Sequence, residues 1–255
     1  MPEQQQPQGD HPRLTPLRIA IGTALTVVGG YVDCFGYLTL SGVYTSQMSG
    51  NTVLIAVHGG HGDASAALLH AYTIGVFVLG LLLSAVGIEL GLRRGMRRVL
   101  ALALTIEIVC LAAFAWWGVP LVEDHAIGTA EEPRWPLYAL LALAAVAMGI
   151  QNTALRMAGV LAIFTTHVTG TLTRFSEQFV EFLLPRSGVR TERAFSQALF
   201  SGGLWLAFLF GALCASELLP RWRAGPMLLP PIAVLLAVIA ADLVRPLAGS
   251  KPATD

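Results

Sequence analysis

Two acidic residues inside long apolar stretches are the first candidates for chemistry. Asp33 closes a charge-free segment that begins at Ile19, and Glu107 lies near the middle of another apolar segment. An ionised carboxylate at such a depth costs about 2.5–3.5 kcal/mol on insertion scales, so it needs a partner, a proton or a task. The functional interpretation is a proton-coupling site at both residues. The structural alternatives are that Asp33 bonds nearby hydroxyls and helix ends, and that Glu107 is a neutral acid bonded to a neighbouring helix.

Two segments rich in hydroxyl groups and glycine are the next candidates. Each carries a hydroxyl-x-x-hydroxyl-glycine element, which opens a short helix and offers free amides to a polar ligand. Ordinary helix capping explains the same pattern. Gln151 and Asn152 occupy the place in the second half that Asp33 occupies in the first. The candidate solute-binding residues are Asp33, Ser49, Gly50, Asn51, Thr52, Gln151, Asn152, Thr166, Thr169 and Gly170.

Other chemistries find little support in the sequence. The segment from His58 to Asp63 reads HGGHGD, but it is glycine-rich and offers no fourth ligand, so we predict no metal site. The 3 cysteines all lie in apolar runs and no nucleotide-binding glycine loop is present, so we expect no cofactor. Acidic residues and histidines are scattered rather than clustered, and we therefore expect that the protein is not an enzyme. Its 16 basic and 16 acidic residues balance, which argues against a nucleic-acid partner.

Apolar helices must position these residues. Of the 255 residues, 55% are hydrophobic and 13% are charged, whereas soluble domains carry about 25% charged residues. The charge-free stretches are long enough for a bilayer, which needs about 20 residues per helix. We predict an all-α polytopic membrane protein with the lipid bilayer as its first partner. The six predicted spans are Leu17–Leu40, Ala66–Ile88, Val99–Trp117, Trp135–Leu155, Phe195–Ala215 and Met227–Ala241.

The basic residues predict the orientation of the spans. With a cytoplasmic N-terminus, all of the 16 Lys and Arg residues except Arg134, Arg221 and Arg223 lie on or near the inner side. The positive-inside rule favours that arrangement. We therefore expect a multi-pass protein of the bacterial cytoplasmic (inner) membrane with both termini in the cytoplasm.

The two halves of the chain resemble each other. We divide the chain into a disordered tail (1–16), a single membrane domain (17–245) and a short C-terminal tail (246–255). The membrane domain consists of a first repeat (17–117), a linker (118–134) and a second repeat (135–245). Residues 41–62 and 157–185 both read as an irregular segment followed by a short helix, broken or re-entrant in the membrane. Three spans per repeat give the two copies opposite topology, although chance similarity between Gly/Thr-rich segments is the alternative.

These segments also carry a family resemblance. The chain resembles the YoaK-like family of small bacterial integral membrane proteins (domain of unknown function 1275) from about Leu17 to Arg245. The resemblance rests on Gly30-Tyr31-Val32-Asp33, Ser49-Gly50-Asn51, Gly149-Ile150-Gln151-Asn152 and Thr169-Gly170-Thr171, with Ser49 where the family more often has threonine. It implies a six-span inner-membrane protein and brings no activity with it.

Inverted repeats with buried acids are typical of secondary transporters. The sequence therefore predicts a small transporter or permease for an unidentified small polar solute, with proton coupling through Asp33 or Glu107. The alternative is a non-catalytic accessory or scaffolding membrane protein. The spacing of Gly87 and Gly91 also allows close helix packing and a homo-oligomer.

Overall fold

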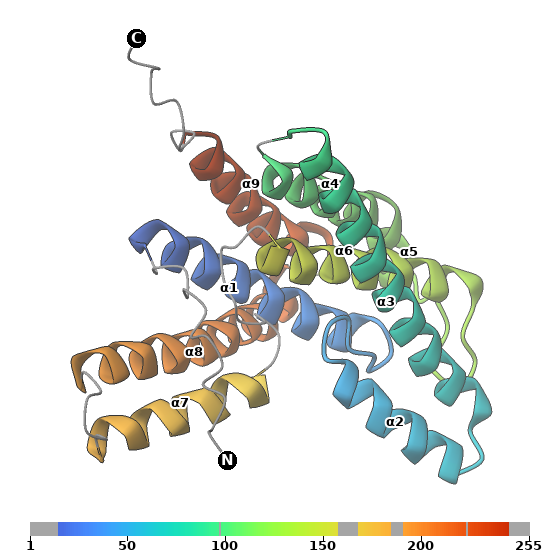
Figure 1. The fold of residues 1–255 in the computed structure, drawn as a ribbon. Coiled ribbons are helices and arrows are strands. Elements are labelled where there is room, and N and C mark those ends of the chain that lie inside the picture. Colours follow the sequence, from blue (N-terminus) through green and yellow to red (C-terminus); the bar gives the residue numbers. More distant parts are fainter. Residues whose placement is uncertain (1–14, 97, 158–167, 185–190, 223, 245–255) are drawn as a thin grey trace, which may run out of the picture.

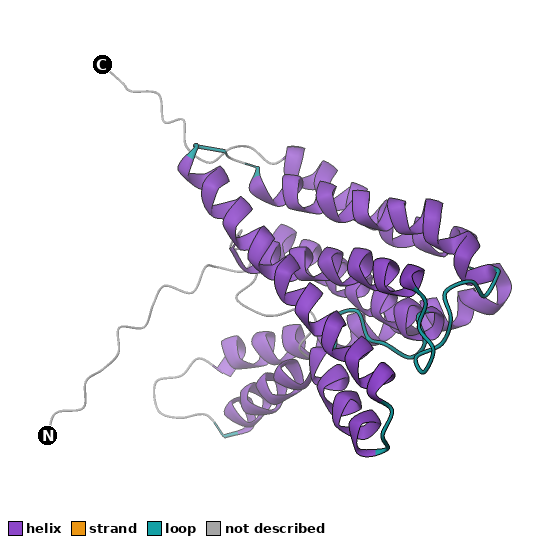
Figure 2. Cartoon of the chain, turned by 90° about the vertical axis from the view of Figure 1, so that its right-hand side faces the viewer, coloured by secondary structure: helices purple, strands orange, loops and turns teal. Residues whose placement is uncertain are grey.

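The computed structural model describes residues 15–96, 98–157, 168–184, 191–222 and 224–244. In this part of the chain the secondary structure is helical, apart from turns and one isolated β-bridge between Gly128 and Pro133 (Figure 2). The helices are α1 (Pro16–Thr39), α2 (Met48–Gly60), α3 (Ala64–Arg93), α4 (Val99–Ala113), α5 (Val119–Glu123), α6 (Trp135–Met157), α7 (Val168–Leu183), α8 (Thr191–Trp222) and α9 (Leu229–Val244).

Six stretches of helix are long and apolar enough to cross a bilayer, which confirms the predicted multi-pass all-α class. They are Pro16–Thr39, Ala64–Arg93, Val99–Glu123, Trp135–Ala154, Ala194–Trp222 and Pro226–Val244. Their outer faces expose large apolar side chains, for example Leu79, Leu82 and Leu83 on α3. In water such surfaces would be unfavourable, whereas the hydrocarbon of a bilayer accommodates them.

The third span is longer than its apolar run suggests. A π-helical turn at Phe114–Gly118 joins α4 to α5, so helical backbone continues to Glu123, inside the predicted 118–134 linker. Pro120 lies just after this π-helical turn, at the second residue of α5. The expected irregular segment also forms, since residues 40–47 are non-helical and lead into α2. The matching part of the second half, 158–167, lies outside the described residues.

Four helices form the centre of the molecule. α1 and α6 contact each other, α4 packs on α6 and α9, and α9 also packs on α1, which closes a ring. α3 packs along α6 and carries α2, whereas α8 packs along α1 and carries α7. Figure 1 shows these two helix pairs on different sides of α1 and α6. α1 and α6 have the most buried spans of the six, because each is covered on several faces.

Glycines allow the two tightest helix crossings. At the crossing of α1 and α8, a Cβ atom on Gly30 would collide with the Phe208 carbonyl, and one on Gly211 with the Val27 carbonyl. At the crossing of α3 and α6, Gly80 faces Val146 and Gly149 faces Phe77 in the same way. Small residues permit such backbone contact between membrane helices. By contrast, no neighbouring atom lies within 4 Å of a Cβ built on Gly87, and Gly91 packs against Val99 of the same chain.

Candidate functional site

Asp33 anchors the loop that follows α1. Its Oδ1 atom accepts hydrogen bonds from the backbone N–H of Thr45 (2.8 Å), the backbone N–H of Ser46 (2.7 Å) and the Thr45 hydroxyl (3.1 Å). Asp33 is 3% exposed, and Thr45 and Ser46 are also buried. The carboxyl group therefore satisfies backbone donors that would otherwise be buried without partners, each at a cost of about 1–3 kcal/mol.

Asn51, on the first turn of α2, holds the same loop from its other side. Its Oδ1 accepts from the Tyr44 N–H at 3.1 Å, and its Nδ2 donates to the Tyr44 carbonyl at 2.7 Å. Asn51 is fully buried. Together, Asp33 and Asn51 fix residues 44–46, which we call the anchored loop. The loop begins after a reversal at Ser41 and Gly42, where φ is positive.

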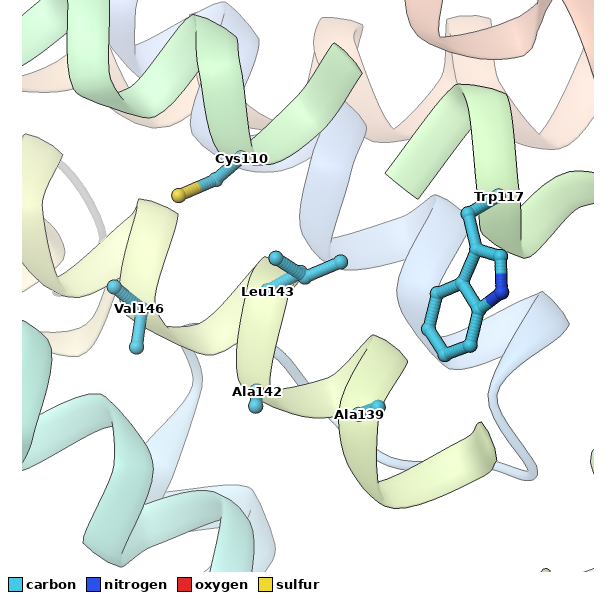
Figure 3. A pocket seen from close by; sticks show the side chains of 6 residues that line it. All are labelled: Cys110, Trp117, Ala139, Ala142, Leu143 and Val146. Atoms are coloured by element: carbon cyan, nitrogen blue, oxygen red, sulfur yellow. The ribbon is translucent and has the colours of Figure 1, made fainter. Parts of the chain in front are cut away.

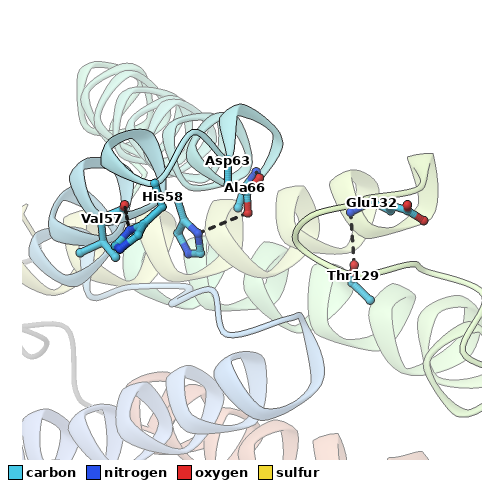
Figure 4. A network of polar contacts seen from close by, with 7 residues as sticks. Val57, His58, Asp63, Ala66, Thr129 and Glu132 are labelled. Carbon is cyan, nitrogen blue, oxygen red and sulfur yellow. Dashed lines mark hydrogen bonds and ion pairs between the residues drawn. The ribbon is translucent and has the colours of Figure 1, made fainter.

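A pair of histidines extends this cluster toward the end of α2. The Nδ1 atom of His70 on α3 lies 3.1 Å from Asn51 Oδ1, and the His70 ring stacks on that of His58 at a centroid distance of 5.4 Å. His58 Nδ1 lies 3.5 Å from the Asp63 carboxylate, which also caps α3 by accepting from the Ala66 N–H (Figure 4). Polar contacts thus run from the partly exposed Asp63 to the anchored loop.

The other candidates of the first half occupy different environments. A Cβ atom on Gly50 would lie 2.9 Å from the Tyr44 ring, so glycine leaves room for this ring, which also stacks on Tyr37. Burial raises the pKa of the Tyr44 phenol, so the phenol is neutral at physiological pH. Ser49 and Thr52 lie on the exposed side of α2, and the Thr52 hydroxyl donates to the Met48 carbonyl. These two hydroxyl groups point away from the Asp33 cluster.

In the second half, the matching polar residues bond between helices. Gln151 Nε2 donates to the Leu25 carbonyl on α1 at 2.7 Å, and Thr153 donates to the Leu81 carbonyl on α3. The Ser84 hydroxyl of α3 donates to the Ile150 carbonyl. Asn152 is buried on the same helix. Polar side chains here join α6 to both of its neighbours.

The hydroxyl-glycine element of the second half is only partly described. Thr166 lies outside the described residues. Thr169 and Gly170 are exposed in the first turn of α7, where the Thr169 carbonyl accepts a bond from the Thr173 hydroxyl. Thr171, one position further on, is buried. The structure therefore brings Asp33 and Asn51 together at one loop and places Gln151 at a separate helix contact.

Glu107 is fully buried on α4, and neither carboxyl oxygen has a hydrogen-bond partner among the described residues. Its environment differs from that of Asp33, although the sequence predicts a proton-coupling role for both residues. Gln151 Oε1 is also buried without a partner. These two groups are the only described side chains of the central ring whose carboxyl or amide oxygens are buried and unpaired.

A shallow groove lies elsewhere, between α4 and α6. Its volume is about 380 Å³, and Figure 3 shows the side chains that line it. They are Cys110, Trp117, Ala139, Ala142, Leu143 and Val146. Since this lining is apolar, the groove is unsuited to a polar solute and contains none of the candidate residues.

The sequence alone did not single out His70, Thr45 or Ser84. His70 is surrounded by apolar residues along the chain, and its contact with Asn51 depends on the packing of α2 against α3. No periodic pattern encodes that contact. Within the described ranges, no group of three His, Cys, Asp or Glu side chains is arranged to hold a metal ion.

Comparison with known proteins places the chain in a family. Residues 21–241 match the family described as "Protein of unknown function (DUF1275)", which covers most of the chain. The chain belongs to the DUF1275 family. It is also similar to the UPF0700 transmembrane protein YoaK of Bacillus subtilis (strain 168), with 27% identity over 153 residues. That match covers 60% of this chain and 63% of the relative's length. No solved structure matches the chain.

The family match confirms the resemblance drawn from the glycine-containing motifs, and the relative's description as a transmembrane protein agrees with a multi-pass membrane protein. Because the family is described as being of unknown function, the match gives this DUF1275 member no activity.

Proposed function

We propose that this protein is a secondary transporter that moves a small polar solute across the bacterial cytoplasmic membrane. The proposal includes an inverted repeat in which α1, α2, α3 and α4 correspond in order to α6, α7, α8 and α9. The observation that carries it is the agreement between the helix contacts of the two halves. Exchanging the halves turns the α1–α8 contact into α6–α3, the α2–α3 contact into α7–α8, and the α1–α9 contact into α6–α4.

The glycines support the same correspondence. Gly30 of α1 then matches Gly149 of α6, and Gly211 of α8 matches Gly80 of α3. All four residues lie at the two tight crossings, which become equivalent under the exchange. Because each half contains an odd number of spans, the second copy runs through the membrane in the opposite direction. Transporters with this architecture bind their solutes near the midplane between the halves.

The proposed orientation has both termini in the cytoplasm, so the turn after α3 lies inside and the loop after α5 outside. It is tested by replacing the 3 native cysteines with serine and adding single cysteines at Arg94 and at Asp124. A membrane-impermeant thiol reagent added to intact cells should label the cysteine at position 124 and leave that at position 94 unlabelled. The reverse labelling would contradict this orientation.

Transport is tested with purified protein in liposomes and a panel of labelled amino acids, sugars, nucleobases, and small organic cations and anions. We expect saturable uptake of one solute class above protein-free liposomes. The same solute should raise the thermal unfolding temperature in detergent. Ser176→Ala, which removes an exposed hydroxyl of α7 that donates to the Leu172 carbonyl of the same helix, is a control that should retain uptake. Absence of both uptake and stabilisation across the panel would refute the proposal.

A second candidate function is that of an accessory membrane protein without transport. It is favoured by the Asp33 cluster, in which the carboxyl oxygen is fully used in holding the anchored loop. On this view the polar residues act only in folding. Variants at Asp33 and Asn51 would then lower stability, and the solute panel would give no uptake with the stable wild-type protein. In either case we propose no chemical reaction for the protein.

A further inference from the structure

The strongest unexplained feature of the described structure is the pair of unpaired polar groups inside the central ring. Glu107 lies on α4 and Gln151 on α6, and these two helices pack against each other. Buried polar groups in proteins almost always have partners, so an unpaired one requires an explanation. Five described side-chain atoms are buried without a partner, and three of them belong to these two residues on adjacent helices of the ring; the other two are Arg18 Nε at the start of α1 and Ser46 Oγ in the anchored loop.

The helix register places these two groups at the same depth. Gln151 of α6 donates a hydrogen bond to the Leu25 carbonyl of α1. This carbonyl points along α1 toward Val28. Phe114, which directly follows α4, packs on Phe35 of α1 with ring centroids 5.7 Å apart, and α1 and α4 run in the same direction in the six-span topology. Glu107 lies seven residues before Phe114, and Val28 lies seven residues before Phe35. Glu107 and Gln151 therefore both lie at the depth of the segment of α1 from Leu25 to Val28, and Gln151 contacts that segment directly.

No described charged group offsets a charge on Glu107. The three ion pairs in the described residues involve Asp63, Glu89 and Glu217. None of the described titratable groups on the helices packed against α4 bonds to Glu107. These groups are Arg18, Tyr31, Asp33, Cys34 and Tyr37 on α1, which reaches the end of α4 through the Phe35–Phe114 contact, His70, Tyr72, Glu89 and Arg93 on α3, Tyr138 on α6 and Asp242 on α9. An ionised carboxylate without a donor or a counter-charge is strongly disfavoured in such a setting, so Glu107 carries a proton here.

We propose that Glu107 is a proton-binding site of the central ring and that Gln151 is its polar partner. In the conformation described here the site is closed and Glu107 is neutral. When the ring opens toward water, the carboxyl O–H bond breaks and the proton passes to water. Rebinding from water on the other side restores the acid. The amide of Gln151 is held by Leu25, so its Oε1 is free to accept a hydrogen bond from the Glu107 hydroxyl as the helices shift.

This inference deepens the proposed transport function, since it names a proton as the coupling ion. It also assigns the two buried acids different roles, with the proton at Glu107 and not at Asp33. The oxygen of Asp33 that accepts three hydrogen bonds would have to release the anchored loop in order to exchange a proton with water.

The test is infrared difference spectroscopy of the full-length protein in lipid nanodiscs at neutral pH. Wild-type protein should show the carbonyl stretch of a protonated carboxylic acid, and this band should be lost in Glu107→Gln, which preserves the shape of the side chain. Transfer to D2O should shift the band to lower frequency over time, because the site opens to water. Gln151→Leu should shift the band, since its hydrogen-bond partner is removed.

Two results would overturn the proposal. One is a carboxylic acid region that is identical in wild-type protein and Glu107→Gln, because Glu107 then carries no proton. The other is a band that never shifts in D2O although the protein's exposed groups exchange, because the proton is then locked in place. The spectra require no transported solute. A solute panel without uptake, combined with an exchanging band, would therefore refute transport and leave the proton site standing.

Discussion

Asp33 and Glu107 are both buried acids in membrane-spanning helices, yet their surroundings are opposite. One oxygen of Asp33 accepts three hydrogen bonds from the anchored loop, whereas neither oxygen of Glu107 has a described partner. Asp33 lies near the end of α1, where the backbone leaves its helix and supplies free N–H groups. Glu107 lies within α4, where every neighbouring N–H is already used by the helix.

The difference shows that burial of an acid does not by itself indicate function. A carboxyl group beside a helix break can accept hydrogen bonds from the free backbone N–H groups there. Its removal then lowers the free energy of unfolding. A carboxyl group inside a regular helix stabilises nothing around it and costs free energy unless it is protonated or bound. We therefore propose a positioning role for Asp33 and a proton-binding role for Glu107. The following predictions test this division, beginning with the largest expected effect.

Asp33→Ala should destabilise the protein by about 3–5 kcal/mol, because it leaves the buried N–H groups of Thr45 and Ser46 without an acceptor. The measurement is reversible unfolding in mixed micelles, followed by circular dichroism. Thr39→Ala is a matched control at the end of the same helix, since it removes only a bond to the Phe35 carbonyl of that helix. Equal, small effects of the two substitutions would show that the anchored loop does not depend on Asp33.

Asn51→Ala should cost about 2–3 kcal/mol, somewhat less than the loss at Asp33, since it removes neutral hydrogen bonds to the N–H and carbonyl of Tyr44. The same unfolding experiment measures it. Asn51→Asp keeps the acceptor for the Tyr44 N–H but turns a carboxyl oxygen toward the Tyr44 carbonyl in a fully buried site, so it should cost at least as much as Asn51→Ala. A neutral effect of Asn51→Ala would argue that Asp33 alone fixes the loop.

The sequence predicts features that depend on neighbouring residues in the chain, but not contacts that depend on how loops and helices pack. The six spans follow from apolar runs between charged residues, and the irregular segment at 40–47 follows from its glycine and hydroxyl content. Because both acids stand among apolar residues in the sequence, the sequence predicts the same proton-coupling role for Asp33 and Glu107. What separates them is the position of Thr45 and Ser46 relative to Asp33, which a turn at Ser41 and Gly42 creates. The contact between His70 and Asn51 likewise arises from helix packing.

His70→Ala should cost about 1–2 kcal/mol, because it removes one hydrogen bond to Asn51 and the stacking on His58. His61→Ala provides the control, since this exposed imidazole bonds only to the carbonyl of Val57 in its own helix. The thermal unfolding temperature of His70→Ala should be clearly lower than that of His61→Ala. The opposite ranking would remove the histidine pair from the group of residues that support the anchored loop.

The most direct test of the division between the two acids compares Asp33→Asn and Glu107→Gln, which replace each acid by its neutral amide. Their unfolding free energies are measured at neutral pH in the same micelles. Asp33→Asn should lose about 1–3 kcal/mol, because the amide must keep its single oxygen toward three donors and places an NH2 group where the second carboxyl oxygen lies. Glu107→Gln should remain within about 0.5 kcal/mol of wild type, since one neutral side chain replaces another of the same shape. A large loss at Glu107 together with an unchanged Asp33→Asn would contradict the assignment of both residues.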